Sequence, residues 1–120
     1  MAQESVLAEK SLAFAVRIVK LNDFLVKEKR ETVISKQIIR SGTSIGANIA
    51  EATYGVSKAD FISKLHISLK ETAETEYWLR LLRMSDCIPQ DLFQMLLNEC
   101  LEIKRILIST LKTTKNNSES

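Results

Sequence analysis

Apolar residues recur every three or four positions in four segments of the chain, a spacing that places them on one face of an α-helix. Local signals mark the segment ends: Ser57 with Asp60 resembles a capping pair, Gly55 suits a helix end, and Pro89 suits a first helical turn. No alternating apolar pattern competes for a strand. The four predicted helices cover residues 5–28, 31–53, 58–85 and 89–112.

Short loops between long helices predict an all-α fold, an antiparallel up-and-down four-helix bundle in which neighbours in sequence pack side by side. The fourth helix carries more apolar surface than such a bundle needs, because two apolar stripes lie next to each other along it. The stripes are Leu92, Leu96, Ile103 and Leu107, and Phe93, Leu97, Leu101 and Ile108. This second surface indicates a homo-oligomer, with either the fourth or the second helix at the contact.

The second helix is unusual because it contains two glycines. Gly42, Gly46 and Ala50 fall four apart and line one side, where another backbone can approach closely. Each interior glycine costs about 1 kcal/mol relative to alanine, and close packing is the expected compensation. Polar residues, among them Ser44 and Asn48, follow the same spacing beside the apolar stripe. Two interpretations of this polar track stay open: a solvated edge, or a polar seam at a subunit contact.

Composition narrows the class of protein. The 120 residues suit one domain, and 45% hydrophobic with 27% charged residues is typical of a globular chain. Residues 113–120 contain no apolar side chain and are predicted to form a disordered tail, which leaves 1–112 as the domain. No segment approaches the ~20 apolar residues of a membrane span, and the N-terminus lacks a signal-sequence pattern. We expect a cytoplasmic protein that does not bind membranes.

The titratable residues form no recognisable metal or catalytic set. Cys87 and Cys100 are the only cysteines and His66 is the only histidine, so a zinc site would lack a fourth ligand and a familiar spacing. Two sparse cysteines favour reduced thiols over a disulfide framework. No nucleophile can be assigned to His66, and Gly42 and Gly46 lie inside a helix rather than in a phosphate-binding loop. We expect no enzyme activity, no metal and no cofactor.

Three glutamates of the third helix, Glu71, Glu74 and Glu76, raise the alternative of metal or acid–base chemistry. Di-iron bundles, however, use glutamate-x-x-histidine motifs, which His66 does not complete. In the structural interpretation, a partly buried Glu76 is held by hydrogen bonds that fix helix register and subunit choice. The candidate partners are Ser44 and Asn48, or an arginine of a neighbouring protomer. The arginines considered are Arg40, Arg80 and Arg83.

The net charge is only +2, from 17 basic and 15 acidic residues, so one protomer has a weak field for nucleic acid. One broad side of the first helix nevertheless carries Lys10, Arg17, Lys20 and Lys27, interrupted by Glu9 and Glu28. Such a mixed face is usually only solvated. An oligomer would repeat it and let it contact several phosphates, so we predict Arg17, Lys20 and Lys27 as nucleic-acid-binding residues.

Two segments resemble a known family. The runs RSGTSIGANIAEA, from Arg40, and KLHISLKETAETEYWLRLL, from Lys64, are similar to the four-helix bundle proteins encoded within bacterial 23S rRNA intervening sequences. The first and fourth helices agree in length and apolar pattern only. Ala52 departs from the pattern, because many members carry glycine soon after Glu51. The family signature and interface residues are Ser41, Gly42, Ser44, Gly46, Asn48, Glu51, Glu71, Glu74, Glu76 and Trp78.

The resemblance implies a homopentameric, barrel-like assembly, similar also to the accessory variability protein of diversity-generating retroelements. Binding of nucleic acid and of a reverse transcriptase is attributed to that relative. For the intervening-sequence proteins, a role with ribosomal RNA is inferred from where their genes lie. Two functions are therefore expected as alternatives: an oligomeric accessory factor that associates with RNA or DNA, and a scaffold that binds a partner protein without touching nucleic acid.

Overall fold

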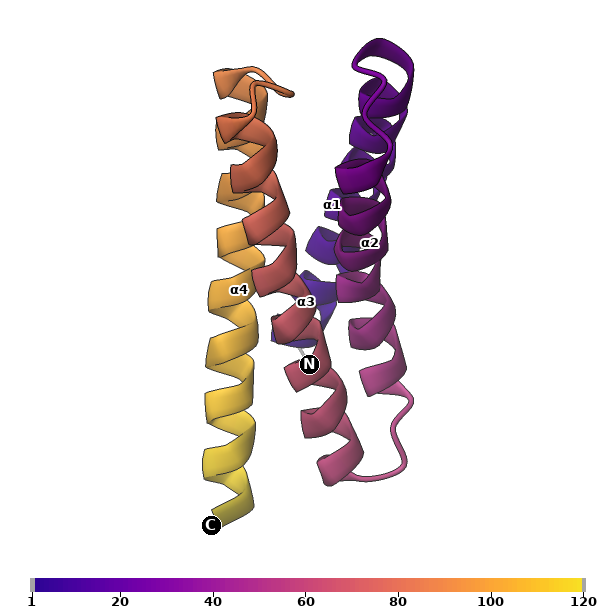
Figure 1. Ribbon diagram of the computed structural model, residues 1–120. Coiled ribbons are helices and arrows are strands. Elements are labelled where there is room, and N and C mark those ends of the chain that lie inside the picture. Colours follow the sequence, from indigo (N-terminus) through magenta and orange to yellow (C-terminus); the bar gives the residue numbers. More distant parts are fainter. Residues whose placement is uncertain (1, 120) are drawn as a thin grey trace.

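The protein forms four helices that pack in the order of the sequence (Figure 1). The computed structural model describes the backbone of residues 2–119 and the side chains of residues 5–116. Within this part of the chain all regular structure is helical, which confirms the prediction of an all-α fold with four helices. Each helix packs against its neighbours in sequence, and α1 closes the bundle against α4. The helices are α1 (Ala2–Glu28), α2 (Val33–Thr53), α3 (Lys58–Met84) and α4 (Gln90–Glu119).

For α2, α3 and α4 the predicted first residue is correct within two residues. Local chemistry explains the starts of α2 and α3. The Ser57 hydroxyl accepts a hydrogen bond from the Asp60 amide at 3.1 Å, which confirms the cap of α3. At α2, Glu31 stays outside the helix because its carboxylate accepts from the amides of Val33 and Ser35, at 3.3 and 2.8 Å. The first turns of α2 and α3 therefore have side-chain partners for amides that no helix carbonyl can reach.

The end of α4 differs from the prediction. The helix continues through Glu119, past the expected end near Lys112 and through the segment predicted to be disordered. Threonine hydroxyls in this region bond back to the preceding turn, from Thr110 to the Ile106 carbonyl and from Thr114 to the Thr110 carbonyl, both at 2.7 Å. No glycine or proline follows Lys112 to stop the helix. Figure 1 shows α4 projecting beyond the turn between α2 and α3.

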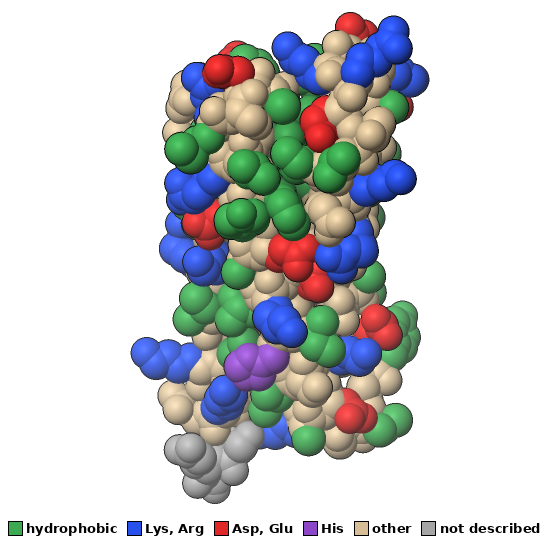
Figure 2. All heavy atoms as spheres, in the orientation of Figure 1, with side chains coloured by type: hydrophobic (Ala, Val, Ile, Leu, Met, Phe, Trp, Pro, Cys, Tyr) green, Lys and Arg blue, Asp and Glu red, His purple; other side chains and the backbone are tan. Residues whose placement is uncertain are grey.

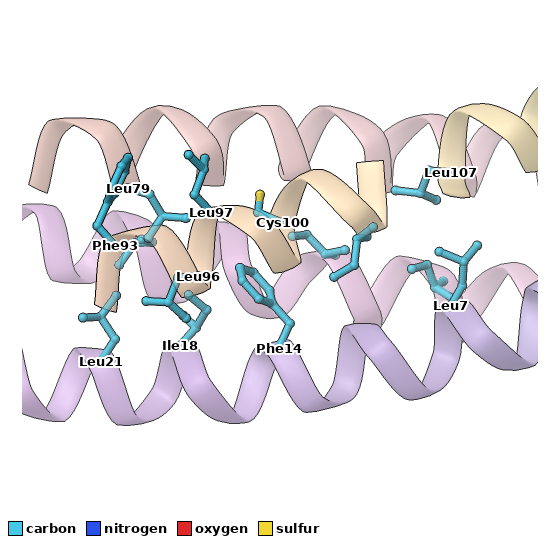
Figure 3. Packing of buried hydrophobic residues seen from close by; sticks show 14 of the residues in the cluster. Leu7, Phe14, Ile18, Leu21, Leu79, Phe93, Leu96, Leu97, Cys100 and Leu107 are labelled. Carbon is cyan, nitrogen blue, oxygen red and sulfur yellow. The ribbon is translucent and has the colours of Figure 1, made fainter. Parts of the chain in front are cut away.

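Buried side chains from all four helices form one core cluster. Figure 3 shows Phe14, Ile18 and Leu21 of α1 directed toward α4, where Leu96 lies, while Leu7 lies near Leu107 further along the bundle. Both stripes predicted on α4 reach this core in part. The buried hydrophobic residues of α4 are Phe93, Leu96, Leu97, Cys100, Ile103, Leu107 and Leu111.

The glycines of α2 are used for packing inside the protomer. A Cβ atom at Gly42 would lie 2.9 Å from Cγ2 of Ile18, and one at Gly46 would lie 3.2 Å from Oγ of Ser11. The predicted close approach of a second helix to this face is therefore real, and α1 of the same chain is the helix that approaches. Ala50, at the end of the same row, is exposed.

Candidate functional site

The interface between α2 and α3 of one protomer carries a row of buried hydroxyls, an arrangement that neither interpretation of the polar track anticipated. Thr75 donates to the Ser41 hydroxyl at 2.9 Å, and Ser68 donates to the Ile45 carbonyl at 2.9 Å. All four residues are buried. Because a hydrogen bond of this kind is broken if the helices slide past each other, these bonds fix the register of α2 against α3.

Glu74 joins the same two helices at their outer edge. Its Oε2 accepts from the Arg40 guanidinium at 2.9 Å and from the Trp78 indole N–H at 3.1 Å. A second cross-helix pair, Lys64 with Glu51 at 3.4 Å, lies nearer the α2–α3 turn. Figure 2 shows acidic side chains in the middle of this face with basic ones beside them. Arg40 of α2 and Glu74 of α3 therefore form an ion pair between the two helices of one protomer.

Glu76 faces α4 instead, and its partners correct the prediction. Arg80 of the same helix donates to its Oε2 at 3.0 and 3.2 Å, and Lys104 of α4 donates to its Oε1 at 3.3 Å. Arg40 pairs with Glu74 rather than Glu76, and Arg83 bonds across the α3–α4 turn to the Ile88 carbonyl at 3.3 Å. Burial alone would raise the pKa of the Glu76 carboxyl, but the hydrogen bonds and charges of Arg80 and Lys104 lower it.

Ser44 and Asn48 also have other partners than Glu76. The Ser44 hydroxyl donates to the Arg40 carbonyl at 2.7 Å, and the Asn48 amide donates to the Ser44 carbonyl at 2.8 Å, both within α2. Glu71 of α3 has one carboxylate oxygen that is buried and lacks a hydrogen bond from any described residue. The three glutamates thus have three separate environments and do not converge on one site.

The remaining candidate groups for chemistry lie apart. Burial raises the pKa of the Cys100 thiol to about 12, with the charge of Glu76 as a smaller cause, so this buried thiol is a poor nucleophile. Cys87 is half-buried near the α3–α4 turn, and His66 is exposed. Among the residues described, no three His, Cys, Asp or Glu side chains are grouped as metal ligands.

The cations predicted to bind nucleic acid occupy different environments along α1. Lys20 is exposed and has no ion-pair partner within residues 5–116. Lys27 pairs with Asp23 one turn earlier at 3.2 Å, where both side chains are largely exposed. Arg17 crosses to α4 and pairs with Glu99 at 3.1 Å. The structure therefore brings two of the three to open solvent and ties the third to another helix.

Three further cations extend this basic surface around the turn between α1 and α2. Lys29, Arg30 and Lys36 are exposed, and Figure 2 shows basic side chains gathered at the end of the bundle that carries this turn. The Lys29 ammonium lies 5.9 Å from the centre of the Phe24 ring, within cation–π range. The sequence contained the signal as the run KEKRE, but helical spacing alone did not connect its lysines with those of α1.

An apolar groove runs along the outer edge between α1 and α2, and we call it the α1–α2 groove. It has a volume of about 260 Å³, contains no charged side chain, and is bordered by Leu12, which is 67% exposed. Val16 and Val19 extend the exposed apolar surface along α1. The residues that line the groove are Ala8, Ser11, Leu12, Ala15, Thr43, Gly46, Ala47 and Ala50.

None of the four helices, over the described residues, combines the length and the apolar character that crossing a bilayer requires.

Comparisons with known proteins agree with the four-helix architecture. A crystal structure of a protein of unknown function, from the S23 ribosomal protein family of Bacteroides thetaiotaomicron, is 55% identical to this chain. The match covers 92% of this chain and 98% of that one, with a TM-score of 0.91. No curated protein matches the sequence. The model of a family described as 23S rRNA-intervening sequence protein matches residues 3–109, so the chain belongs to the 23S rRNA-intervening sequence protein family.

Proposed function

We propose that the protein is a non-enzymatic, oligomeric accessory factor that associates with RNA or DNA through the cations of α1 and of the α1–α2 turn. The exposure of these cations on one helix and its turn is the observation that carries the proposal. Lys20, Lys27 and Lys29 are all exposed, and Lys20 has no ion-pair partner within residues 5–116. A family description that refers to 23S rRNA supports the same class of ligand.

Self-association increases the number of cations that can contact phosphates, because one protomer offers only a few. The α1–α2 groove is apolar and uncharged, so it does not attract phosphates, and covering it with a second copy would bury Leu12, Val16 and Val19. The pentamer implied by the family resemblance is the assembly that we propose. When the protomer is repeated around a ring, the cations of all copies form one continuous basic surface.

Charge reversal tests the proposed nucleic-acid surface. Lys20→Glu with Lys29→Glu should weaken binding of a fluorescein-labelled RNA duplex. It should also flatten the plot of log affinity against log salt by about 0.9 for each phosphate that the variant no longer neutralises. Lys58→Glu with Lys70→Glu is the matched control, because it reverses two exposed lysines of α3 with the same change in net charge. Equally weakened binding by both variants, or unchanged binding by the first, would contradict the proposed surface.

The self-association is tested separately. Ala47→Arg places a charge on the wall of the α1–α2 groove at an exposed position, so the fold of the protomer should tolerate it. Light scattering should then report a smaller mass than for the wild type, whereas Ala59→Arg on the outer side of α3 should leave the mass unchanged. An unchanged mass for Ala47→Arg would exclude the groove as the contact.

A second candidate function, a protein-binding scaffold, is favoured by a different surface. Tyr77 and Met84 are 60% and 85% exposed on α3, and Val33 is exposed on α2. Figure 2 shows a group of hydrophobic side chains on the drawn face, above the acidic ones in its middle. Tyrosine, tryptophan and methionine are enriched in protein–protein interfaces. Salt-insensitive capture of a partner protein, together with no binding of RNA or DNA, would favour this function over the first.

A further inference from the structure

The interface between α1 and α4 is the least extensive of the four helix interfaces and is bridged by two ion pairs. Lys10 of α1 lies 3.0 Å from Glu102 of α4, and Arg17 lies 3.1 Å from Glu99. We call these four residues the α1–α4 clasp. They line a cavity of about 150 Å³ together with Ala13 and Ile103. The Arg17 side chain is 42% exposed and that of Lys10 is 39% exposed, so an anion in solution can reach both cations.

Glu99 is an imperfectly satisfied member of the clasp. Its Oε2 meets Arg17, but its Oε1 is buried and receives no hydrogen bond from the described residues. A buried carboxylate oxygen without a donor is costly, so the Arg17–Glu99 pair is weaker than its short distance suggests. Arg17 also donates to the Ala13 carbonyl at 3.1 Å, which keeps its guanidinium at the edge of the cavity.

We propose that the α1–α4 clasp is a masked phosphate-binding site, in which Glu99 and Glu102 hold Arg17 and Lys10 until a nucleic-acid phosphate displaces the two carboxylates. The proposal rests on the proposed association with nucleic acid and names a site for it. Guanidinium and ammonium groups bind phosphate as they bind carboxylate, and a guanidinium matches phosphate with two parallel hydrogen bonds. The clasp thereby places two further cations on the helix that carries exposed Lys20.

Displacement of the Glu99 carboxylate from Arg17 is coupled to the uptake of a proton. The groups that face Glu99 are Arg17 and Lys10 from α1 and Glu102 from its own helix. Burial raises the pKa of the Glu99 carboxyl, while the charges of Arg17 and Lys10 oppose that rise. When Arg17 turns to a phosphate, this opposition weakens and the pKa rises further, so binding takes up a proton. Affinity for nucleic acid therefore increases as the pH falls.

Glu99→Gln with Glu102→Gln removes the mask while keeping the shape of both side chains. The matched control, Asp60→Asn with Asp91→Asn, removes the same two charges from exposed positions of α3 and α4 that have no cation partner in residues 5–116. At about 0.1 M salt, the clasp variant should bind a labelled RNA duplex about eightfold more tightly for each cation freed. This factor follows from a salt slope of about 0.9 per phosphate. Urea denaturation of both variants verifies that they are folded.

Two further readouts separate unmasking from a general change in charge. Adding Arg17→Gln to the clasp variant should remove the roughly eightfold share of the increase that Arg17 contributes and leave the share of Lys10, and Glu99→Gln alone should remove the pH dependence of the affinity. An equal increase in the Asp60 and Asp91 control would overturn the masked site, as would an undiminished increase after Arg17→Gln. Either result leaves the proposed function standing, provided that the wild type binds RNA.

A small probe distinguishes failure of the site from failure of the function. Sodium pyrophosphate is titrated against wild type and the clasp variant, and the NMR signal of the Arg17 Nε–H group is followed. Tighter pyrophosphate binding by the variant supports the masked site even if neither protein binds RNA or DNA, a result that would refute the proposed function. No response of Arg17 to pyrophosphate or RNA in the variant would overturn the masked site.

Discussion

Replacing each glycine of α2 with alanine tests the packing of α1 on α2 quantitatively. In both variants the added methyl removes the cost of glycine within a helix and stabilises the fold by about 1 kcal/mol. At Gly42 the new Cβ would lie 2.9 and 3.0 Å from two carbons of Ile18, which is fully buried. A β-branched side chain has little rotational freedom in a helix, so Ile18 cannot turn away from the contact.

The two variants are therefore expected to differ in sign. Overpacking of this kind costs about 1–3 kcal/mol, which leaves Gly42→Ala less stable than wild type by up to about 2 kcal/mol. At Gly46 the nearest atom is the Ser11 hydroxyl oxygen at 3.2 Å, which can move by rotation about one bond. Gly46→Ala should then be as stable as wild type or more stable by up to about 1 kcal/mol.

Urea denaturation at a fixed protomer concentration measures this difference, because self-association would otherwise shift the midpoint. Ile18→Ala provides a double-mutant cycle. Alone it should cost about 2–5 kcal/mol, and in the Gly42→Ala background it should cost less, because the overpacked contact is relieved. If Gly42→Ala proved more stable than Gly46→Ala, or if the cycle showed no coupling, the close approach of Ile18 to Gly42 would be refuted.

Three other predictions concern titratable groups. The pKa of Glu76 is lowered in the folded protein, so its ionised form stabilises the fold above the unfolded value, and this contribution is lost as the pH falls below about 4.5. Glu76→Gln should reduce the free energy of unfolding at pH 7 and flatten its fall in acid. An unchanged acid profile would rule out the ion pairs. The pKa of Glu99 is raised, so the sign is opposite: its contribution is present at low pH and is lost as the pH rises through the folded pKa. Glu99→Gln should increase the urea midpoint at pH 7, and a decrease would show that the pair with Arg17 outweighs the burial. Cys87 should react with a thiol reagent in the native protein, whereas Cys100, with a pKa of about 12, should react only on unfolding. Equal rates for the two thiols would contradict the burial of Cys100.

The fold was predictable because its signals are local and agree with one another. Apolar spacing indicated all four helices, and Ser57 with Asp60 marked the start of α3 through a bond that spans only three residues. The end of α4 was missed because the absence of apolar residues after Lys112 indicates exposure, and an exposed segment can still be helical. Only a glycine or proline would have marked the end in the sequence.

The partners of the charged residues were harder to predict, because they depend on rotation and register between helices. Glu74 and Glu76 are two residues apart and therefore face different neighbours, α2 and α4. Lys104 lies between Ile103 and Arg105 on α4, and nothing in the sequence signalled that it would reach Glu76. For the same reason, the sequence placed Arg17 among the free cations, and only the packing of α1 on α4 pairs it with Glu99.

The most direct test of the central claim is the affinity of the wild-type oligomer for an RNA duplex across a range of salt concentrations, with the mass of the same sample measured by light scattering. We predict a mass of several protomers, five if the family assembly applies, and an affinity that falls steeply as salt rises, because phosphate contacts release counterions. A monomer, or an oligomer that binds neither RNA nor DNA at low salt, would contradict the account.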